Sequence, residues 1–228
     1  ALRVAQKKGY AEADPTNDVA GYDAARKLAI LASIGFHANV TFDDVLVEGI
    51  EKISQNDVQY ASEMGYTIKL LAVAIRQENG IALNLYPAFV PRSHPLASVK
   101  GSYNAIYVTG NIVDDVMFYG KGAGSLPTAS AVMGDVISTA KHILNHSTGT
   151  GMMLTETKRI PFYSSLKLEN SYYFRLIVDD VTGVLSQIAS AYADNDISIK
   201  EVVQKSRIED AAELMIITEK TPREISIH

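Results

Sequence analysis

The residues best suited to chemistry lie near the start of the chain, where four carboxylates are followed by one lysine. The carboxylates belong to Glu12, Asp14, Asp18 and Asp23, and the lysine is Lys27. Four negative charges around one amine repel each other unless a cation or a substrate ammonium group completes the cluster. Such a site suits a zwitterionic, amino-acid-like ligand, and its lysine can donate a proton to an oxygen that gains negative charge.

Two interpretations of Asp23 and Lys27 follow from their spacing of four residues. The first is a surface salt bridge on a helix, worth about 0.3–0.5 kcal/mol. The second follows from a helical wheel, on which both side chains lie within roughly 60° of Ile30 and Ile34. Because that stripe includes apolar residues, we expect the pair to face protein or a pocket.

The elements that must position this cluster follow from the hydrophobic pattern. Ser54 and Asp57 predict a capping box, and Gly65 predicts the end of that helix. Alternating apolar residues predict strands, which are followed by a glycine-rich loop and a long apolar-striped helix. The predicted ranges are helices at 22–34 and 54–66, strands at 67–77 and 81–87, a strand pair at 104–120, and a helix after the KGAGSLP segment at 121–127.

Residues 1–147 therefore predict an α+β domain with a mostly antiparallel sheet and helices on one face. A polar, glycine-bearing linker at 148–170 separates this domain from a smaller unit at 171–228. The smaller unit predicts the order strand, helix, strand, strand. A helix that begins at residue 1 without a cap is predicted at one end, and a further helix start is predicted at Thr221–Glu224 at the other. We therefore expect the natural protein to continue beyond both ends of the chain.

Composition argues against several classes of protein. The net charge is −5, and no run of Lys and Arg exceeds two residues, which argues against nucleic-acid or anionic-membrane partners. The absence of cysteine excludes disulfides, thiolate zinc sites and thiol nucleophiles. No apolar run is long enough to span a bilayer and no signal peptide opens the chain, so we expect a cytoplasmic protein. His142 and His146 lack the glutamate of a zinc-binding helix motif and are predicted to be surface residues, with no metal site.

The segment at residues 5–27 resembles the signature of homoserine dehydrogenases. Matching positions are Ala5, Gly9, Tyr10, Asp14, Pro15, Asp18, Val19, Gly21, Asp23 and Lys27. Residues 40–50 and 120–136 resemble further segments of that family's catalytic domain. The resemblance therefore covers roughly residues 1–147 and implies reversible reduction of L-aspartate 4-semialdehyde to L-homoserine by NAD(P)H, within threonine and methionine biosynthesis.

The same resemblance implies a role for each acidic residue. Lys27 would be the acid–base group that protonates the aldehyde oxygen, and Asp23 would orient Lys27. Glu12 and Asp18 would belong to the substrate pocket, towards the ammonium group. Asp14 also matches the signature, but its plainer interpretation as a helix cap is favoured.

The family resemblance also implies an N-terminal Rossmann domain that binds NAD(P), and these 228 residues contain no such domain. The loop at 120–124 has Ser125 where the third glycine of the dinucleotide fingerprint belongs, and no βαβ unit surrounds it. Gly122 and Gly124 are therefore expected to form a tight turn near the nicotinamide end of the cofactor. We expect the chain alone to be inactive.

Residues 174–204 resemble an ACT domain, a small ferredoxin-like βαββαβ module that senses ligands, here in partial form. An amino-acid effector would bind where the loop meets the helix, at Asp179, Gly183 and Val184, because helix-start amides suit a carboxylate. The pathway end product threonine is the expected effector. The plainer interpretation is a small packing or dimerisation subdomain.

Two expectations concern the whole chain. Apolar residues at 69–75 and 81–86 predict a sheet face that a second copy covers, which gives a homodimer. The alternative to an enzyme is a non-catalytic amino-acid sensor, in which the catalytic-like domain is only a scaffold for the ACT module.

Overall fold

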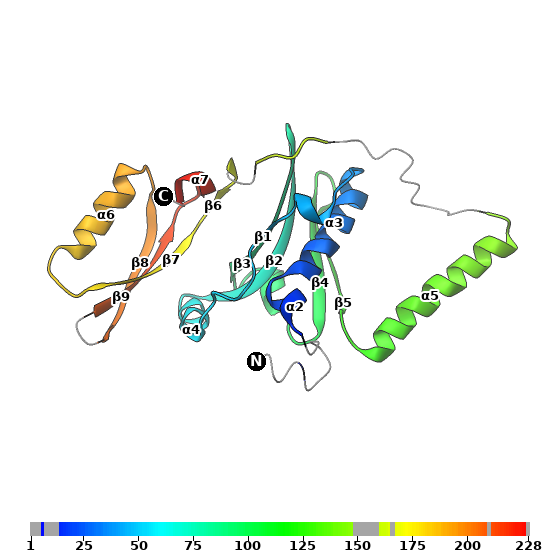
Figure 1. Ribbon diagram of the computed structural model, residues 1–228, viewed down its shortest axis with the longest axis horizontal. Helices are drawn as coiled ribbons and strands as arrows, with labels where there is room; N and C mark the ends of the chain where they lie inside the picture. The colour runs from blue at the N-terminus through cyan, green and yellow to red at the C-terminus, as the bar shows by residue number, and fades with distance from the viewer. Residues whose placement is uncertain (1–5, 7–13, 148–159, 165–166, 209–210, 227–228) are drawn as a thin grey trace. The chain divides into compact units, whose positions relative to one another are not determined.

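The computed structural model describes residue 6 and residues 14–147, 160–164, 167–208 and 211–226 (Figure 1). The chain divides into two compact units, of which the first comprises residues 1–73 and 85–159. The second comprises residues 74–84 and 160–228. Antiparallel pairs occur in both units and helices accompany them, so the predicted α+β class is confirmed.

The first part of the chain follows the predicted order of helices and strands. Its elements are α2 (Thr16–Val19), α3 (Tyr22–Phe36), η1 (Phe42–Asp44), β1 (Leu46–Val47), α4 (Gln55–Glu63), β2 (Tyr66–Gln77), β3 (Gly80–Pro91), η2 (Pro95–Ser98), β4 (Tyr103–Gly110), β5 (Asp114–Lys121) and α5 (Ser125–Leu144). The capping box of α4 is confirmed: the Ser54 N–H and hydroxyl donate to Asp57 Oδ2 at 2.8 and 2.6 Å.

Strand β3 is the central strand of a three-stranded sheet with the order β1-β3-β2. A central strand can be buried on both faces, and Ile81, Leu83 and Leu85 are 0–2% exposed. The expectation that Ile81, Leu83 and Leu85 offer apolar surface to a second copy is therefore wrong, because these side chains are buried within one copy. The contribution of residues 69–75 and the homodimer itself stay predictions.

Helix α3 is held against this sheet by small residues. Its buried positions Ala25, Leu28, Ala29 and Ala32 recur with helical spacing. Gly21 precedes the helix with φ +83°, and a Cβ placed there would lie 2.4 Å from Leu85 Cδ2. Only glycine allows both this backbone conformation and this close approach.

Gly21→Ala is expected to lower the free energy of unfolding by about 2–4 kcal/mol, the sum of left-handed backbone strain and overpacking. Gly35→Ala, in the same helix, is the matched control. A Cβ there meets no atom within 4 Å, so a gain of about 0.5 kcal/mol is expected. Urea titration measures both values, and equal stability of the two variants would contradict the close approach at Gly21.

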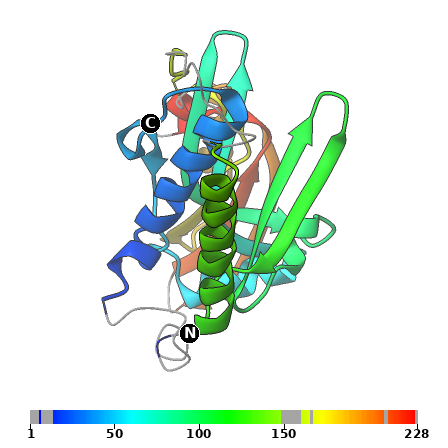
Figure 2. The same cartoon turned by 90° about the vertical axis from the view of Figure 1, so that its right-hand side faces the viewer.

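Strands β4 and β5 form a separate two-stranded hairpin (Figure 2). Ile106 pairs with Phe118, and these side chains are 40% and 62% exposed. Helix α5 begins at Ser125, directly after the glycine loop, and has no buried residue among its twenty. Its apolar positions, Leu126, Val132, Met133, Val136, Ile137, Ile143 and Leu144, are all exposed.

Residues 173–218 of the second unit follow the predicted order of strand, helix, strand and strand, and shorter elements flank them. Its elements are β6 (Glu169–Asn170), β7 (Tyr173–Asp179), α6 (Val184–Asp194), β8 (Ile199–Ile208), β9 (Ala211–Thr218), β10 (Thr221–Pro222) and α7 (Arg223–Ser226). The sheet order is β7-β9-β8, and helix α6 covers one face through an edge contact between Tyr192 and Phe174. Ile81 and Phe162, which both belong to the second unit, form an isolated parallel β-bridge.

The predicted helix start, with Thr221 as the N-cap and Pro222 as the first helical residue, is wrong by one residue. Thr221 and Pro222 pair with Asn170 and Glu169 as a short antiparallel bridge, and the helix begins at Arg223. The partner strand lies about fifty residues earlier in the chain, so local capping signals could not reveal it.

Candidate active site

Asp23 and Lys27 form an ion pair across one turn of α3. Lys27 Nζ lies 2.6 Å from Asp23 Oδ2, and the two side chains are 55% and 49% exposed. A surface ion pair of this kind adds little to the stability of the fold. Its geometry can therefore serve a chemical role. The carboxylate holds the ammonium group in one direction while leaving it accessible.

Asp23 and Lys27 are more exposed than their apolar stripe predicts, and the groove beside them is lined by other residues. Ile30 is 60% exposed, although Ile30 and Ile34 both line an open groove of about 460 Å³. The groove is lined by Arg26, Ala29, Ile30, Ser33, Ile34, Val40, Thr41 and Phe42. Within the described chain the stripe thus borders a groove and is not buried by protein.

Within the described part of the chain, no hydrogen bond or ion pair links Asp14 or Asp18 to the Asp23–Lys27 pair. Asp14 Oδ1 accepts bonds from the Thr16 hydroxyl and N–H at 2.6 and 3.1 Å. The N-cap of α2 is Pro15, so the predicted cap at Asp14 is wrong by one residue, although Asp14 does bond the first residue of the helix. These bonds hold the pKa of Asp14 below its usual value. Asp18 is exposed on α2. Glu12 lies outside the described residues.

Arg26 was not predicted to be a functional residue, but its contacts connect α2, α3 and η1. Arg26 Nη1 donates to Asn17 Oδ1 at 3.1 Å, and its guanidinium carbon lies 5.3 Å from the centre of the Phe42 ring. Tyr22 meets the same Phe42 ring edge-on at 5.8 Å. The only sequence signal was the spacing of Tyr22 and Arg26, which places both on one side of α3.

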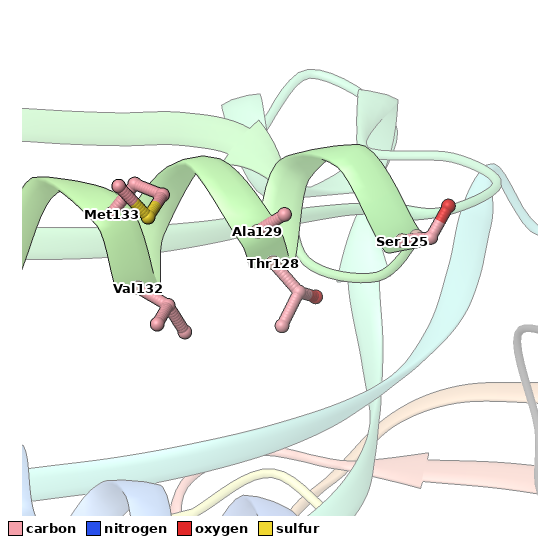
Figure 3. A pocket seen from close by; sticks show the side chains of 6 residues that line it. Ser125, Thr128, Ala129, Val132 and Met133 are labelled. Atoms are coloured by element: carbon pink, nitrogen blue, oxygen red, sulfur yellow. The ribbon is translucent and has the colours of Figure 1, made fainter.

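The glycine loop and the start of α5 border a second open groove, of about 610 Å³. Its lining residues are Gly124, Ser125, Thr128, Ala129, Val132 and Met133. Thr128 and Val132 project from the same side of the helix (Figure 3). Gly124 has φ +126°, which suits a tight turn. Gly122 has no positive φ, and a Cβ there would meet the Asn104 side chain, so its glycine is explained by close approach and not by the turn.

The predicted effector residues lie on one connection of the second unit. Asp179 ends β7, Gly183 with φ +95° caps α6, and Val184 begins that helix. The Val184 N–H donates to the Val181 carbonyl at 3.4 Å, so this amide already has a partner within the loop. A Cβ on Gly183 would meet no atom within 4 Å.

A polar cluster on the β4–β5 hairpin was also missed by sequence reasoning. Thr109 Oγ1 donates to Asp115 Oδ1 at 2.7 Å, and the His94 and Tyr107 rings lie 4.8 Å apart. Hydrogen bonds from Tyr107 and then Thr109 hold the pKa of Asp115 below its usual value, and the bond to Asp115 raises the pKa of Tyr107. The strand register, which places Thr109 opposite Asp115, could have indicated this cluster.

The described residues hold neither a metal-binding cluster nor a membrane-spanning helix. They contain no group of three His, Cys, Asp or Glu side chains arranged to hold a metal ion. None of the described helices combines the length and hydropathy needed to cross a bilayer.

Comparison with known proteins identifies close relatives. The sequence pattern of the family described as homoserine dehydrogenase matches residues 1–137. The chain is 43% identical over 222 residues to the homoserine dehydrogenase of Corynebacterium glutamicum, covering 95% of this chain and 49% of that one. For the Bacillus subtilis homoserine dehydrogenase the identity is 38%, with 96% and 51% covered. The chain thus spans about half the length of the curated relatives it matches.

Solved structures give the same result. The crystal structure of a homoserine dehydrogenase from Thiobacillus denitrificans aligns over 99% of this chain and 52% of that chain, with a TM-score of 0.89 and 37% identity. A Staphylococcus aureus homoserine dehydrogenase aligns with a TM-score of 0.71 at 31% identity, covering 99% and 54%.

Proposed function

The chain belongs to the homoserine dehydrogenase family of oxidoreductases, and from this we propose that the whole protein interconverts L-aspartate 4-semialdehyde and L-homoserine with NAD(P)H. The observation that carries the proposal is the accessible Asp23–Lys27 pair, 2.6 Å apart, inside the segment that matches the family. A scaffold without catalysis has no need of a lysine held in this way.

Lys27 is the proposed acid–base group. In the direction of reduction, its ammonium group donates a proton to the aldehyde oxygen as negative charge develops there. In the reverse direction the neutral amine accepts the proton of the homoserine hydroxyl. Asp23 holds Lys27 in place through the 2.6 Å contact. Asp18 and Glu12 are proposed to bind the substrate's ammonium group, for which carboxylates are suitable partners.

The cofactor is proposed to be NAD(P), which supplies the hydride when bound. The residues present fit only one end of it: the groove at Gly124 offers the Ser125 and Thr128 hydroxyls and helix-start amides. They do not fit its pyrophosphate, because Ser125 replaces the third glycine of the fingerprint. We therefore assign Gly122 and Gly124 to the nicotinamide end, and the rest of the cofactor to the half of the relatives' length that this chain does not span.

The full-length protein is expected to oxidise homoserine and to reduce the semialdehyde, followed as NAD(P)H absorbance. The 228 residues expressed alone are expected to give only the background rate, because hydride transfer needs a positioned nicotinamide. Turnover by the 228 residues alone would contradict the assignment of the cofactor site. Background rates from the full-length protein with both cofactors would favour the non-catalytic sensor instead.

Regulation and assembly complete the proposal. Residues 171–228 are proposed to be a partial ACT domain, and the order β7, α6, β8 and β9 supports this proposal. Asp179, Gly183 and Val184 are proposed to bind an amino acid such as threonine. A homodimer in the cytoplasm is proposed as well. The exposed Ile106–Phe118 face of the β4–β5 hairpin supports it, as apolar surface that a second copy could cover.

A further inference from the structure

We propose that Arg26 is a positioning residue, which fixes helix α2, and with it Asp18, relative to Lys27. The inference rests on the proposed function, because that function gives Asp18 and Lys27 their roles. The family resemblance assigned no role to Arg26, although it directly precedes Lys27 in α3.

Helix α2 needs contacts from outside to hold its orientation. It has four residues, a single turn, which is too short to be stable by itself. One end is fixed by the backbone, since the Val19 carbonyl accepts a bond from the Ile50 N–H at 2.9 Å. The rotation of α2 about its axis is fixed by a side-chain contact, in which Arg26 Nη1 donates to Asn17 Oδ1 at 3.1 Å.

Arg26 can serve as a fixed point because its guanidinium group is itself held. It lies 5.3 Å from the centre of the Phe42 ring, and Tyr22 packs edge-on against the same ring. Phe42 is in turn positioned by η1, whose start is a capping box between Thr41 and Asp44. Stacking on a fixed ring restricts the rotamers that an exposed arginine would otherwise explore.

The bond to Asn17 determines where Asp18 points. Adjacent residues of a helix project about 100° apart, so turning Asn17 towards Arg26 sets the direction of Asp18. The Asp18 N–H donates to the Pro15 carbonyl at 3.0 Å. Its carboxylate is exposed and, within the ranges that the structure describes, makes no hydrogen bond or ion pair. Its carboxylate is thus held by the backbone of α2 and remains available to a ligand's ammonium group.

The test measures kcat and KM for homoserine in the full-length enzyme carrying Asn17→Ala, Arg26→Gln, or both. Each single variant is expected to raise KM by about 3- to 10-fold, the effect of one hydrogen bond, while kcat changes much less. The double variant is expected to raise KM no further than one single variant, because both remove the same contact. Arg92→Gln is the matched control: Arg92 is exposed and bonds the Ser62 carbonyl and hydroxyl at 2.8 and 2.6 Å, and its loss is expected to leave KM unchanged.

Four outcomes decide the proposal. Non-additive increases in KM, with thermal midpoints within about 4 °C of the parent, support it. An increase for Arg26→Gln without one for Asn17→Ala means that Arg26 binds the substrate directly, and it overturns the positioning role. An equal increase for Arg92→Gln overturns it as well. An unmodified enzyme that does not oxidise homoserine overturns the proposed function, and the positioning role with it.

Discussion

In the full-length enzyme, Lys27→Ala is expected to lower kcat by about 10²- to 10⁴-fold and to change KM much less. The reason is that the lysine acts mainly as negative charge develops on the substrate oxygen, so its loss affects the transition state more than substrate binding. Steady-state kinetics with homoserine and with the semialdehyde measures the effect in both directions. Asp23→Asn is expected to lower kcat as well, because the neutral amide holds the ammonium group less firmly than the carboxylate 2.6 Å away.

Gln59→Ala is the matched control for this pair. Gln59 Nε2 donates to Glu63 Oε1 at 2.9 Å on the exposed side of α4, with the same spacing of four residues. Its removal is expected to leave kcat unchanged. If Lys27→Ala and Asp23→Asn behave like Gln59→Ala, the pair is only a surface salt bridge and Lys27 is not the acid–base group.

Gly183→Val is expected to abolish inhibition of the full-length enzyme by threonine. A Cβ at Gly183 meets no atom within 4 Å, so the added side chain enters the space where the proposed ligand would lie. The residue also has φ +95°, which strains any side chain by about 1–2 kcal/mol. The measurement is each variant's ratio of activity with and without threonine.

Gly65→Val separates backbone strain from loss of the ligand site. Gly65 has φ +82° and equally open surroundings, but it ends helix α4 in the first unit. This variant is expected to keep its response to threonine. Persistent inhibition of Gly183→Val would show that the effector binds elsewhere. If calorimetry detects no heat with threonine, methionine, isoleucine or lysine, residues 171–228 act as a packing unit only.

The sequence was sufficient for features that depend on neighbouring residues. Alternation and turn residues predicted the β4–β5 hairpin, and the register places Ile106 opposite Phe118. Ser54 and Asp57 predicted the start of α4 because a capping box is contained in four residues. The spacing of Asp23 and Lys27 likewise predicted a direct contact on one side of α3.

Features that depend on distant pairing could not be predicted in the same way. Thr221 and Pro222 have good local signals for a helix, but a backbone partner at 169–170 makes them a strand. Burial of Ile81 follows from the central position of β3, which no local pattern determines. The contacts of Arg26 with Asn17 and Phe42 join residues from three elements. None of these three residues belongs to a recognisable sequence motif, so the contacts could not be predicted.

The division of the hairpin β2–β3 between the two units has a consequence for protein engineering. Residues 74–84, at its tip, belong with 160–228, while its base belongs to the first unit. The chain therefore passes from one unit to the other three times, and a single cut near residue 160 does not isolate either unit. A chimera that grafts residues 160–228 onto another enzyme would leave part of that unit behind, so a working transplant must carry the eleven-residue hairpin tip as a second insert.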